Sequence, residues 1–294
     1  MRVTQSMLSN NMLKNLSYSY SKLGKLQEQI NTGKKVTRPS DDPVVAMKGI
    51  SYRTELNNVE QFSRNIGEAY NWLDTTDDTF DKIGATLQRA NELIVQASSD
   101  TTTPEDRTKI DAELQQLREH VQNLANTKIG DRYIFSGTKT TTAPYDGNGY
   151  DTNVVDTAFK NTIEIEVFDG INIQINSAPI DILKNIDDMF TQISSDISER
   201  KTGGELSSHI QTIDLNMNKL LEERANIGAR QNRVELMDER LQSQEIIATK
   251  RMSENEDIDY EKAITEMITQ ESIHRAALSV GARIVQPTLV DFLR

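Results

Sequence analysis

The chain contains no cysteine among its 294 residues. Disulfide bonds, zinc–thiolate sites and cysteine nucleophiles are therefore excluded. Aromatic residues make up 5% and apolar residues 36% of the chain, both low for a compact globule of this length. A mean hydropathy of -0.57 with 27% charged residues is typical of long helices that expose much of their circumference.

The sequence also lacks any apolar run of the roughly 18 residues that a membrane-spanning helix needs. Its N-terminus has no continuous apolar segment of the kind found in Sec-type signal peptides. We therefore expect no membrane partner and no cleaved signal peptide, which leaves other export routes open.

The net charge of -12 argues against nucleic acid or an anionic membrane as the main partner. This charge is uneven, because residues 1–40 carry seven basic groups and one acidic group, a net of +6, and the remainder carries -18. Two interpretations stay open: the N-terminal segment attracts an acidic neighbour, or it is a solvated basic arm without a partner.

No constellation of residues predicts catalysis. The three histidines, His120, His209 and His274, fall on different predicted helices, and none has a second histidine at ligand spacing. The sequence has no phosphate-binding glycine loop, no Gly-x-Ser-x-Gly and no His-Glu-x-x-His. The segment 146–151 has only a superficial likeness to a calcium loop. We predict a protein that is not an enzyme and has no cofactor or metal.

The first helical pattern, from about Gln5 to Thr32, has a thin apolar face and is marginal alone in water. A second pattern, from Pro43 to about Ser98, has apolar residues at alternating three- and four-residue steps, which predicts a coiled-coil seam. Its twelve positions are Val59, Phe62, Ile66, Ala69, Leu73, Thr76, Phe80, Ile83, Leu87, Ala90, Ile94 and Ala97. Thr103 and Pro104 then predict the start of a third helix.

A β-hairpin is predicted where apolar and polar residues alternate between Ile163 and Ile175. A three-residue loop, 168–170, pairs Val167 with Ile171 and Ile165 with Ile173, and places Gly170 in a left-handed conformation. A two-residue turn would pair Val167 with Asn172 and put the isoleucines on opposite faces, so we predict the three-residue loop.

Helical patterns resume at Asp181, continue from about Glu205 to Ser253, and return from Tyr260 until Pro287. The predicted fold class is mainly α: an elongated rod of long coiled-coil helices from both termini, with a small β-hairpin-containing insertion. We expect three parts. Residues 1–32 with 260–294 form terminal arms, 33–135 with 205–259 form a helical bundle, and 136–204 form the excursion. Because the arms are short and weakly apolar, we expect partners to complete their burial.

The segment 31–43 predicts the end of the first helix and the start of the second. Gly33 suits the left-handed position past a helix end, and Lys34 and Lys35 suit the negative end of the helix dipole. Asp42 followed by Pro43 predicts an N-cap and a first helical residue.

The run Ile30-Asn-Thr-Gly-Lys-Lys-Val-Thr-Arg-Pro-Ser-Asp-Asp-Pro43 resembles the corresponding segment of the flagellin superfamily. Its Pro-Ser-Asp-Asp-Pro ending resembles the hook–filament junction branch, where flagellins usually carry Asn-Ser-Ala-Lys-Asp-Asp-Ala. The resemblance extends to Tyr133–Lys139, to Glu223–Glu235, and to the spacing of Ser253, Asp257, Asp259 and Ala263. It covers roughly residues 1–140 and 205–294.

The resemblance implies an extracellular structural protein of the bacterial flagellum, exported by the type III apparatus and placed at the hook–filament junction. It implies hook-associated protein 1, flagellin and an export chaperone as partners. It also implies self-association in a ring of about eleven subunits, through contacts that need not close.

The resemblance further implies that the terminal arms fold into an inner coiled coil on assembly. The predicted assembly interface is Leu13, Leu16, Leu23, Ile30, Ile273, Ala277, Val280, Ile284, Leu289 and Phe292. The predicted inter-helix loop is Arg38, Pro39, Ser40, Asp41, Asp42 and Pro43.

Three alternatives remain open: a short or minor flagellin that forms the filament, a cytosolic coiled-coil adaptor, and an enzyme inserted in a flagellin-like frame. Residues 137–200 hold no nucleophile–base or metal set, which disfavours the last.

Overall fold

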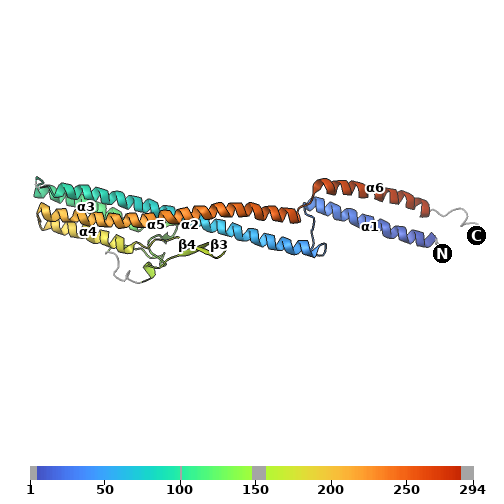
Figure 1. Cartoon of the computed structure of the whole chain (residues 1–294), viewed down its shortest axis with the longest axis horizontal. Coiled ribbons are helices and arrows are strands. Elements are labelled where there is room, and N and C mark those ends of the chain that lie inside the picture. Colours follow the sequence, from blue (N-terminus) through green and yellow to red (C-terminus); the bar gives the residue numbers. More distant parts are fainter. Residues whose placement is uncertain (1–4, 100, 148–156, 286–294) are drawn as a thin grey trace, which may run out of the picture. The chain divides into compact units, whose positions relative to one another are not determined.

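The computed structural model describes residues 5–99, 101–147 and 157–285. Helices dominate these residues (Figure 1), so the mainly α prediction is confirmed. The helices are α1 (Gln5–Thr32), α2 (Pro43–Ala97), α3 (Pro104–Ala125), α4 (Ile180–Ser198), α5 (Gly203–Glu256) and α6 (Tyr260–Val285).

Two compact units make up the chain. Unit 1 comprises Met1–Asn58 and Gln244–Arg294, and unit 2 comprises Val59–Ser243. The boundaries fall within α2 and α5, so each of these helices contributes to both units. The three-part division expected from the sequence has its boundaries elsewhere, at 32/33, 135/136, 204/205 and 259/260, and stays a prediction.

The core of unit 2 follows the predicted seam of α2. Eleven of its twelve positions are buried, and Phe62 is partly buried against the core. The polar member, Thr76, is 1% exposed, and its hydroxyl donates a hydrogen bond to the carbonyl of Trp72 at 2.7 Å. Because this hydroxyl has a partner within the helix, α2 runs unbroken through the threonine-rich stretch.

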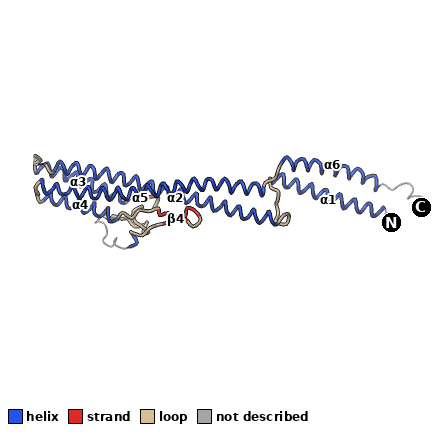
Figure 2. Tube along the Cα trace, viewed as in Figure 1, coloured by secondary structure: helices blue, strands red, loops and turns tan. Residues whose placement is uncertain are grey.

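The helices α3, α4 and α5 cover the remaining sides of this core (Figure 2). Thr103 caps α3 as predicted, since its hydroxyl accepts the amide of Asp106 at 3.2 Å. Arg118 of α3 binds the buried carboxylate of Asp187 in α4 with two hydrogen bonds, at 2.7 and 2.9 Å. Along α5 within unit 2, apolar residues seven positions apart are buried: Ile227, Val234 and Leu241.

Two small antiparallel hairpins lie between α3 and α4. In the first, β1 (Lys128–Ile129) pairs with β2 (Arg132–Tyr133). In the second, β3 (Glu164–Phe168) pairs with β4 (Ile171–Gln174).

The predicted register of the second hairpin is partly wrong. Ile165 pairs with Ile173 and Gly170 is left-handed, as expected, but Phe168 and not Val167 pairs with Ile171. The turn therefore has two residues, and Val167 forms a bulge that restores the register. This arrangement buries Val167 and stacks Phe168 on Phe62 of α2 at 6.1 Å, contacts that the alternating pattern did not contain.

Unit 1 is built differently. Helices α1 and α6 pack side by side (Figure 1), with the rings of Tyr20 and His274 at 6.0 Å. Among its described residues only three apolar side chains are buried: Leu26, Ala248 and Ala263. The large buried cluster of the chain lies entirely in unit 2.

We predict that Phe80→Ala lowers the free energy of unfolding of unit 2 by about 3–5 kcal/mol, because it removes a buried ring and leaves a cavity. Phe80 is 1% exposed and stacks on Phe135 at 5.3 Å. Urea unfolding followed by circular dichroism measures the change. Leu215→Ala, at a position 55% exposed, is the control and should change the free energy by less than about 0.5 kcal/mol.

Candidate assembly site

Within the described ranges no group of three His, Asp or Glu side chains could hold a metal ion. Among the same residues, no helix combines the length and apolarity needed to cross a membrane.

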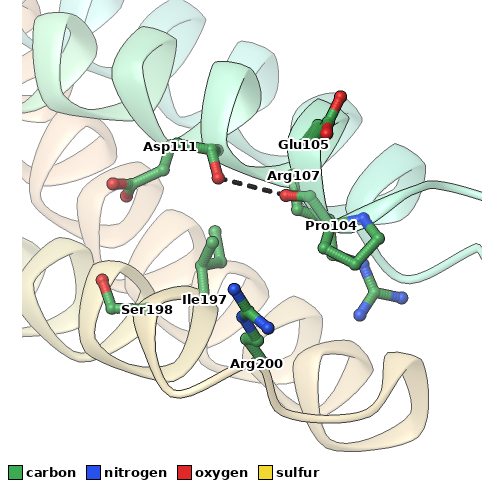
Figure 3. A pocket seen from close by; sticks show the side chains of 8 residues that line it. Pro104, Glu105, Arg107, Asp111, Ile197, Ser198 and Arg200 are labelled. Atoms are coloured by element: carbon green, nitrogen blue, oxygen red, sulfur yellow. Dashed lines mark hydrogen bonds between the residues drawn. The ribbon is translucent and has the colours of Figure 1, made fainter.

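A cleft of about 300 Å³ lies between the start of α3 and the end of α4 (Figure 3). It is lined by Arg107, Asp111 and Arg200, among others. The guanidinium of Arg107 donates to the carbonyl of Lys201 at 3.1 Å, so this side chain holds the α4–α5 turn. The cleft offers no nucleophile next to a base.

The feature that brings distant segments together is the connector, residues 33–42, which joins α1 to α2 within unit 1. It begins at Gly33, whose φ of +71° suits glycine, as predicted. It ends at Asp42, whose carboxylate accepts the amides of Val44 and Val45 at 3.0 and 3.1 Å. The predicted N-cap of α2 is thus confirmed, and Pro43 is the first residue of the helix.

The connector pairs with the segment that joins α5 to α6. The amide of Lys35 donates to the carbonyl of Glu256 at 2.7 Å, and the amide of Ile258 donates to the carbonyl of Gly33 at 2.9 Å. Lys34 and Asp257 form an antiparallel bridge between them. The exit of α1 and the entry of α6 are therefore joined by backbone hydrogen bonds.

A buried carboxylate lies where these two connecting segments pair, a place that we call the crossing. Glu256 is 7% exposed and accepts hydrogen bonds from Lys34 at 2.8 Å and from Arg53 of α2 at 2.6 Å. Burial by itself would raise the pKa of Glu256, but the bonds from Arg53 and Lys34 hold it below its ordinary value. We call Glu256, Lys34 and Arg53 the clamp.

Gly49 makes room for the clamp. A Cβ atom at this position of α2 would collide with the carboxylate oxygen of Glu256. The neighbouring Asn255 donates its side-chain amide to the carbonyl of Val45 at 3.0 Å. The end of α5 is thus held against the first turns of α2 by both side chains.

The residues of the predicted inter-helix loop all lie in the connector or at its end. Lys25 of α1 pairs with Asp41 at 3.0 Å, and this hydrogen bond lowers the pKa of Asp41. Arg38 approaches Glu28 at 3.7 Å, and the amide of Asp41 closes a turn on the carbonyl of Arg38. Pro39 and Ser40 are exposed within this turn.

The predicted assembly residues divide into three groups. Leu13, Ile273 and Val280 are exposed, at 60%, 49% and 56%. Four are half-buried: Leu16, Leu23, Ile30 and Ala277. The side chain of Ile284, together with Leu289 and Phe292, lies outside the described residues.

Several residues of this region have contacts that the sequence did not predict. Lys34 and Lys35 were predicted to interact with the end of α1, whereas Lys34 binds Glu256 and Lys35 donates its ammonium to the carbonyl of Glu254 in α5. Glu256 and Arg53 were not identified, because they are 203 residues apart in the chain. The one sequence feature that pointed to a close approach here is Gly49, a glycine within α2 at a position that the structure shows to be buried. Large exposed apolar side chains on α6 were also missed: Ile264, Ile268 and Leu278.

Comparison with known proteins gives a consistent result. Residues 3–140 match the bacterial flagellin N-terminal helical region, and residues 210–293 match the bacterial flagellin C-terminal helical region. The chain is 27% identical to flagellar hook-associated protein 3 of Escherichia coli, over 94% of this chain and 95% of that protein. It is 24% identical to flagellin of Bacillus subtilis, over 97% of each chain.

The crystal structure of Bacillus cereus FlgL has a similar fold. It superposes with a TM-score of 0.60 at 24% sequence identity, covering 69% of this chain and 99% of that one.

We predict that Glu256→Gln speeds hydrogen exchange of the Lys35 and Ile258 amides by about tenfold or more. The change leaves Lys34 and Arg53 without a countercharge, and hydrogen bonds to charged groups contribute about 1.5–3 kcal/mol each. Hydrogen exchange with mass spectrometry measures the effect. Glu254→Gln is the matched control, since its side chain lies 3.9 Å from Lys250 on an exposed surface.

The same protection should depend on pH. The folded chain holds the pKa of Glu256 below its ordinary value of 4.5. The carboxylate therefore contributes its full stabilisation above about pH 4.5 and loses it as the pH falls through the folded pKa. Equal exchange rates in Glu256→Gln and the unmodified chain at neutral pH would contradict the role of the clamp.

Proposed function

The chain belongs to the bacterial flagellin superfamily, and we propose that it is the adaptor that joins hook-associated protein 1 to the flagellin filament. Members of this family are structural proteins of the flagellum and not enzymes. The observation that carries the junction assignment is the similarity to hook-associated protein 3 over 94% of this chain and 95% of that protein. Residues 39–43 carry the Pro-Ser-Asp-Asp-Pro sequence that resembles the junction branch, and in the structure this stretch includes the turn at Asp41 and the N-cap of α2 at Asp42.

The arms are the part that assembles. In the single chain α1 and α6 cover each other on one side only, and large apolar side chains remain in contact with water on both helices. Leu13, Ile273 and Val280 are three of these, and further copies would bury them. The assembly interface consists of these residues together with the half-buried ones and with Ile284, Leu289 and Phe292.

The finer features of this assembly follow from the same assignment. The copies form a ring of about eleven, with heterologous contacts that continue a helical lattice. One side of the ring binds hook-associated protein 1 and the other binds flagellin. The chain reaches the cell exterior through the type III export apparatus, escorted by an export chaperone and without a cleaved signal peptide.

A short flagellin is the second candidate. The 24% identity to Bacillus subtilis flagellin over 97% of each chain supports it. The two functions differ in the length of the homopolymer that the purified protein should form. Long homopolymeric filaments grown from the purified protein would favour the flagellin, whereas the adaptor gives short assemblies only. A purely cytosolic adaptor fits neither similarity.

We predict that deletion of the gene leaves hooks in place and sheds flagellin into the medium. We expect this result because flagellin would have no adaptor to bind at the end of the hook. Immunoblots of medium and cells, with electron microscopy of hooks, measure it. Normal attached filaments in the deletion strain would rule out the junction role.

We predict that the double substitution Leu13→Ser with Ile273→Ser prevents flagellin from attaching at the end of the hook, without unfolding the chain. Both side chains are about half exposed or more, so their loss should change the stability of the single chain by less than about 1 kcal/mol. Flagellin in the medium reports function, and circular dichroism reports folding. Leu215→Ser with Leu221→Ser, at exposed positions of unit 2, is the control and should leave filaments attached.

A further inference from the structure

The turn between α4 and α5, residues 199–202, contains a strained residue. Arg200 has a φ of +58°, and within the described ranges no other residue except glycine has a positive φ. Its amide donates to the carbonyl of Ile197 at 3.0 Å, and the amide of Lys201 donates to the carbonyl of Asp196 at 3.1 Å. These two bonds form a Schellman motif, whose left-handed position is usually glycine. An arginine keeps this conformation only where surrounding contacts impose it.

A buried carboxylate supplies such contacts. Asp196 is 6% exposed, and His209 of α5, which lies against it, is 8% exposed. One oxygen of Asp196 accepts the ammonium of Lys201 at 2.6 Å and the side-chain amide of Gln192 at 3.0 Å. The other oxygen lies 2.7 Å from Nε2 of His209. We call Asp196, Lys201 and His209 the latch, because they join the end of α4, the turn and the start of α5.

The turn is also tied to α3. Arg107 of α3 donates to the carbonyl of Lys201, the same residue whose ammonium binds Asp196. Arg200 and Ile197 line the cleft between α3 and α4, and Figure 3 shows the side chain of Arg200 reaching from the end of α4 toward α3. The cleft therefore keeps its shape only while the turn is held.

No other buried carboxylate can replace Asp196 in this role. Among the described residues it is the only carboxylate within ion-pair distance of His209. Glu199, which is 3.5 Å from Lys201, has 61% of its side chain exposed. The other charged groups that face the latch or the cleft beside it are all less buried than Asp196: Glu105, Arg107 and Asp111 on α3, Arg200 in the turn, and Glu205 on α5.

The charge of Asp196 depends on pH. Burial alone would raise the pKa of Asp196, but the hydrogen bonds from Lys201, His209 and Gln192 hold it below its ordinary value of 3.8. The carboxylate therefore contributes its full stabilisation above about pH 3.8 and loses it as the pH falls through the folded pKa. In acid the imidazole of His209 carries a positive charge, so protonation of Asp196 leaves two cations around a neutral group.

We propose that the latch is acid-sensitive: it holds the strained turn against α3, and it releases the turn when Asp196 takes up a proton. Release lets Arg200 leave the left-handed conformation, so the strain favours opening. The end of α4 is then free to move, and with it the side of the cleft that Ile197, Ser198 and Arg200 form. This inference does not depend on the junction role, because all of these residues lie within unit 2 of a single chain.

Hydrogen exchange of the full chain between about pH 7 and about pH 3, corrected for the intrinsic pH dependence of exchange, tests the proposal. We expect the amides of Arg200, Lys201 and Leu206, which all bond within or next to the turn, to lose protection below about pH 3.8. Amides in the middle of α2, such as that of Leu87, should stay protected. Unchanged protection of the turn on acidification, or equal loss in α2, would overturn the proposal.

Removal of the charge provides the second arm. Asp196→Asn should speed exchange of the turn amides at neutral pH about tenfold, the change that corresponds to about 1.4 kcal/mol. Glu199→Gln is the matched control, because its carboxylate also approaches Lys201 but is exposed, and it should change exchange by less than about threefold. Equal rates in the two variants contradict the latch. Loss of protection throughout unit 2 in Asp196→Asn would also contradict it, since the carboxylate would then support the whole bundle.

Relief of the strain provides the third arm. Arg200→Gly removes the Cβ that crowds the left-handed backbone, so it should slow exchange of the Lys201 and Leu206 amides about fivefold. The same substitution should also slow their exchange in the Asp196→Asn chain. Equal or faster exchange after Arg200→Gly would show that strain at this residue does not favour opening.

Discussion

Two helices packed side by side can bury only one stripe on each, and this limit shapes unit 1. Its described part buries only Leu26, Ala248 and Ala263 among the apolar side chains and exposes large ones on α1, α2 and α6. Unit 2 escapes the limit because α3, α4 and a hairpin close over α2 and α5, so that residues such as Leu73 and Phe190 lose nearly all contact with water. One part of the chain therefore has its own core, and the other leaves apolar surface exposed, as the proposed assembly requires.

With so little apolar burial, unit 1 depends on polar contacts at its chain crossing. The backbone bonds between 33–35 and 256–258 join the two connecting segments, and the clamp adds a charged pair from α2. A buried carboxylate with two cations is costly to break, because the loss of one partner leaves the others without compensation. The crossing therefore keeps the starts of α2 and α6 in register with the ends of α1 and α5.

Much of the fold was predictable because it repeats over many turns. The α2 seam has twelve positions, so its alternating three- and four-residue spacing is clear even though one of them, Thr76, is polar. The hairpin was harder. Its alternating pattern correctly paired Ile165 with Ile173, but the bulge at Val167 depends on Phe62 and the core beneath, which lie elsewhere in the sequence. The assembly residues came from the family resemblance and stay a prediction, to which the structure adds which of them the single chain leaves exposed: Leu13, Ile273 and Val280 among those described.

The sequence by itself determined the helices, the cap at Asp42, the left-handed Gly33 and the resemblance to the flagellins. Each of these depends on residues within a few positions of one another, where spacing dictates geometry. Only the tertiary structure decided what Lys34, Lys35 and Arg53 bind. The partner of Lys34 is 222 residues away, and the local pattern suggested a nearer one, the end of its own helix. The border between the two units also emerged only from the structure, because α2 and α5 pass through both units and no break in the sequence marks it.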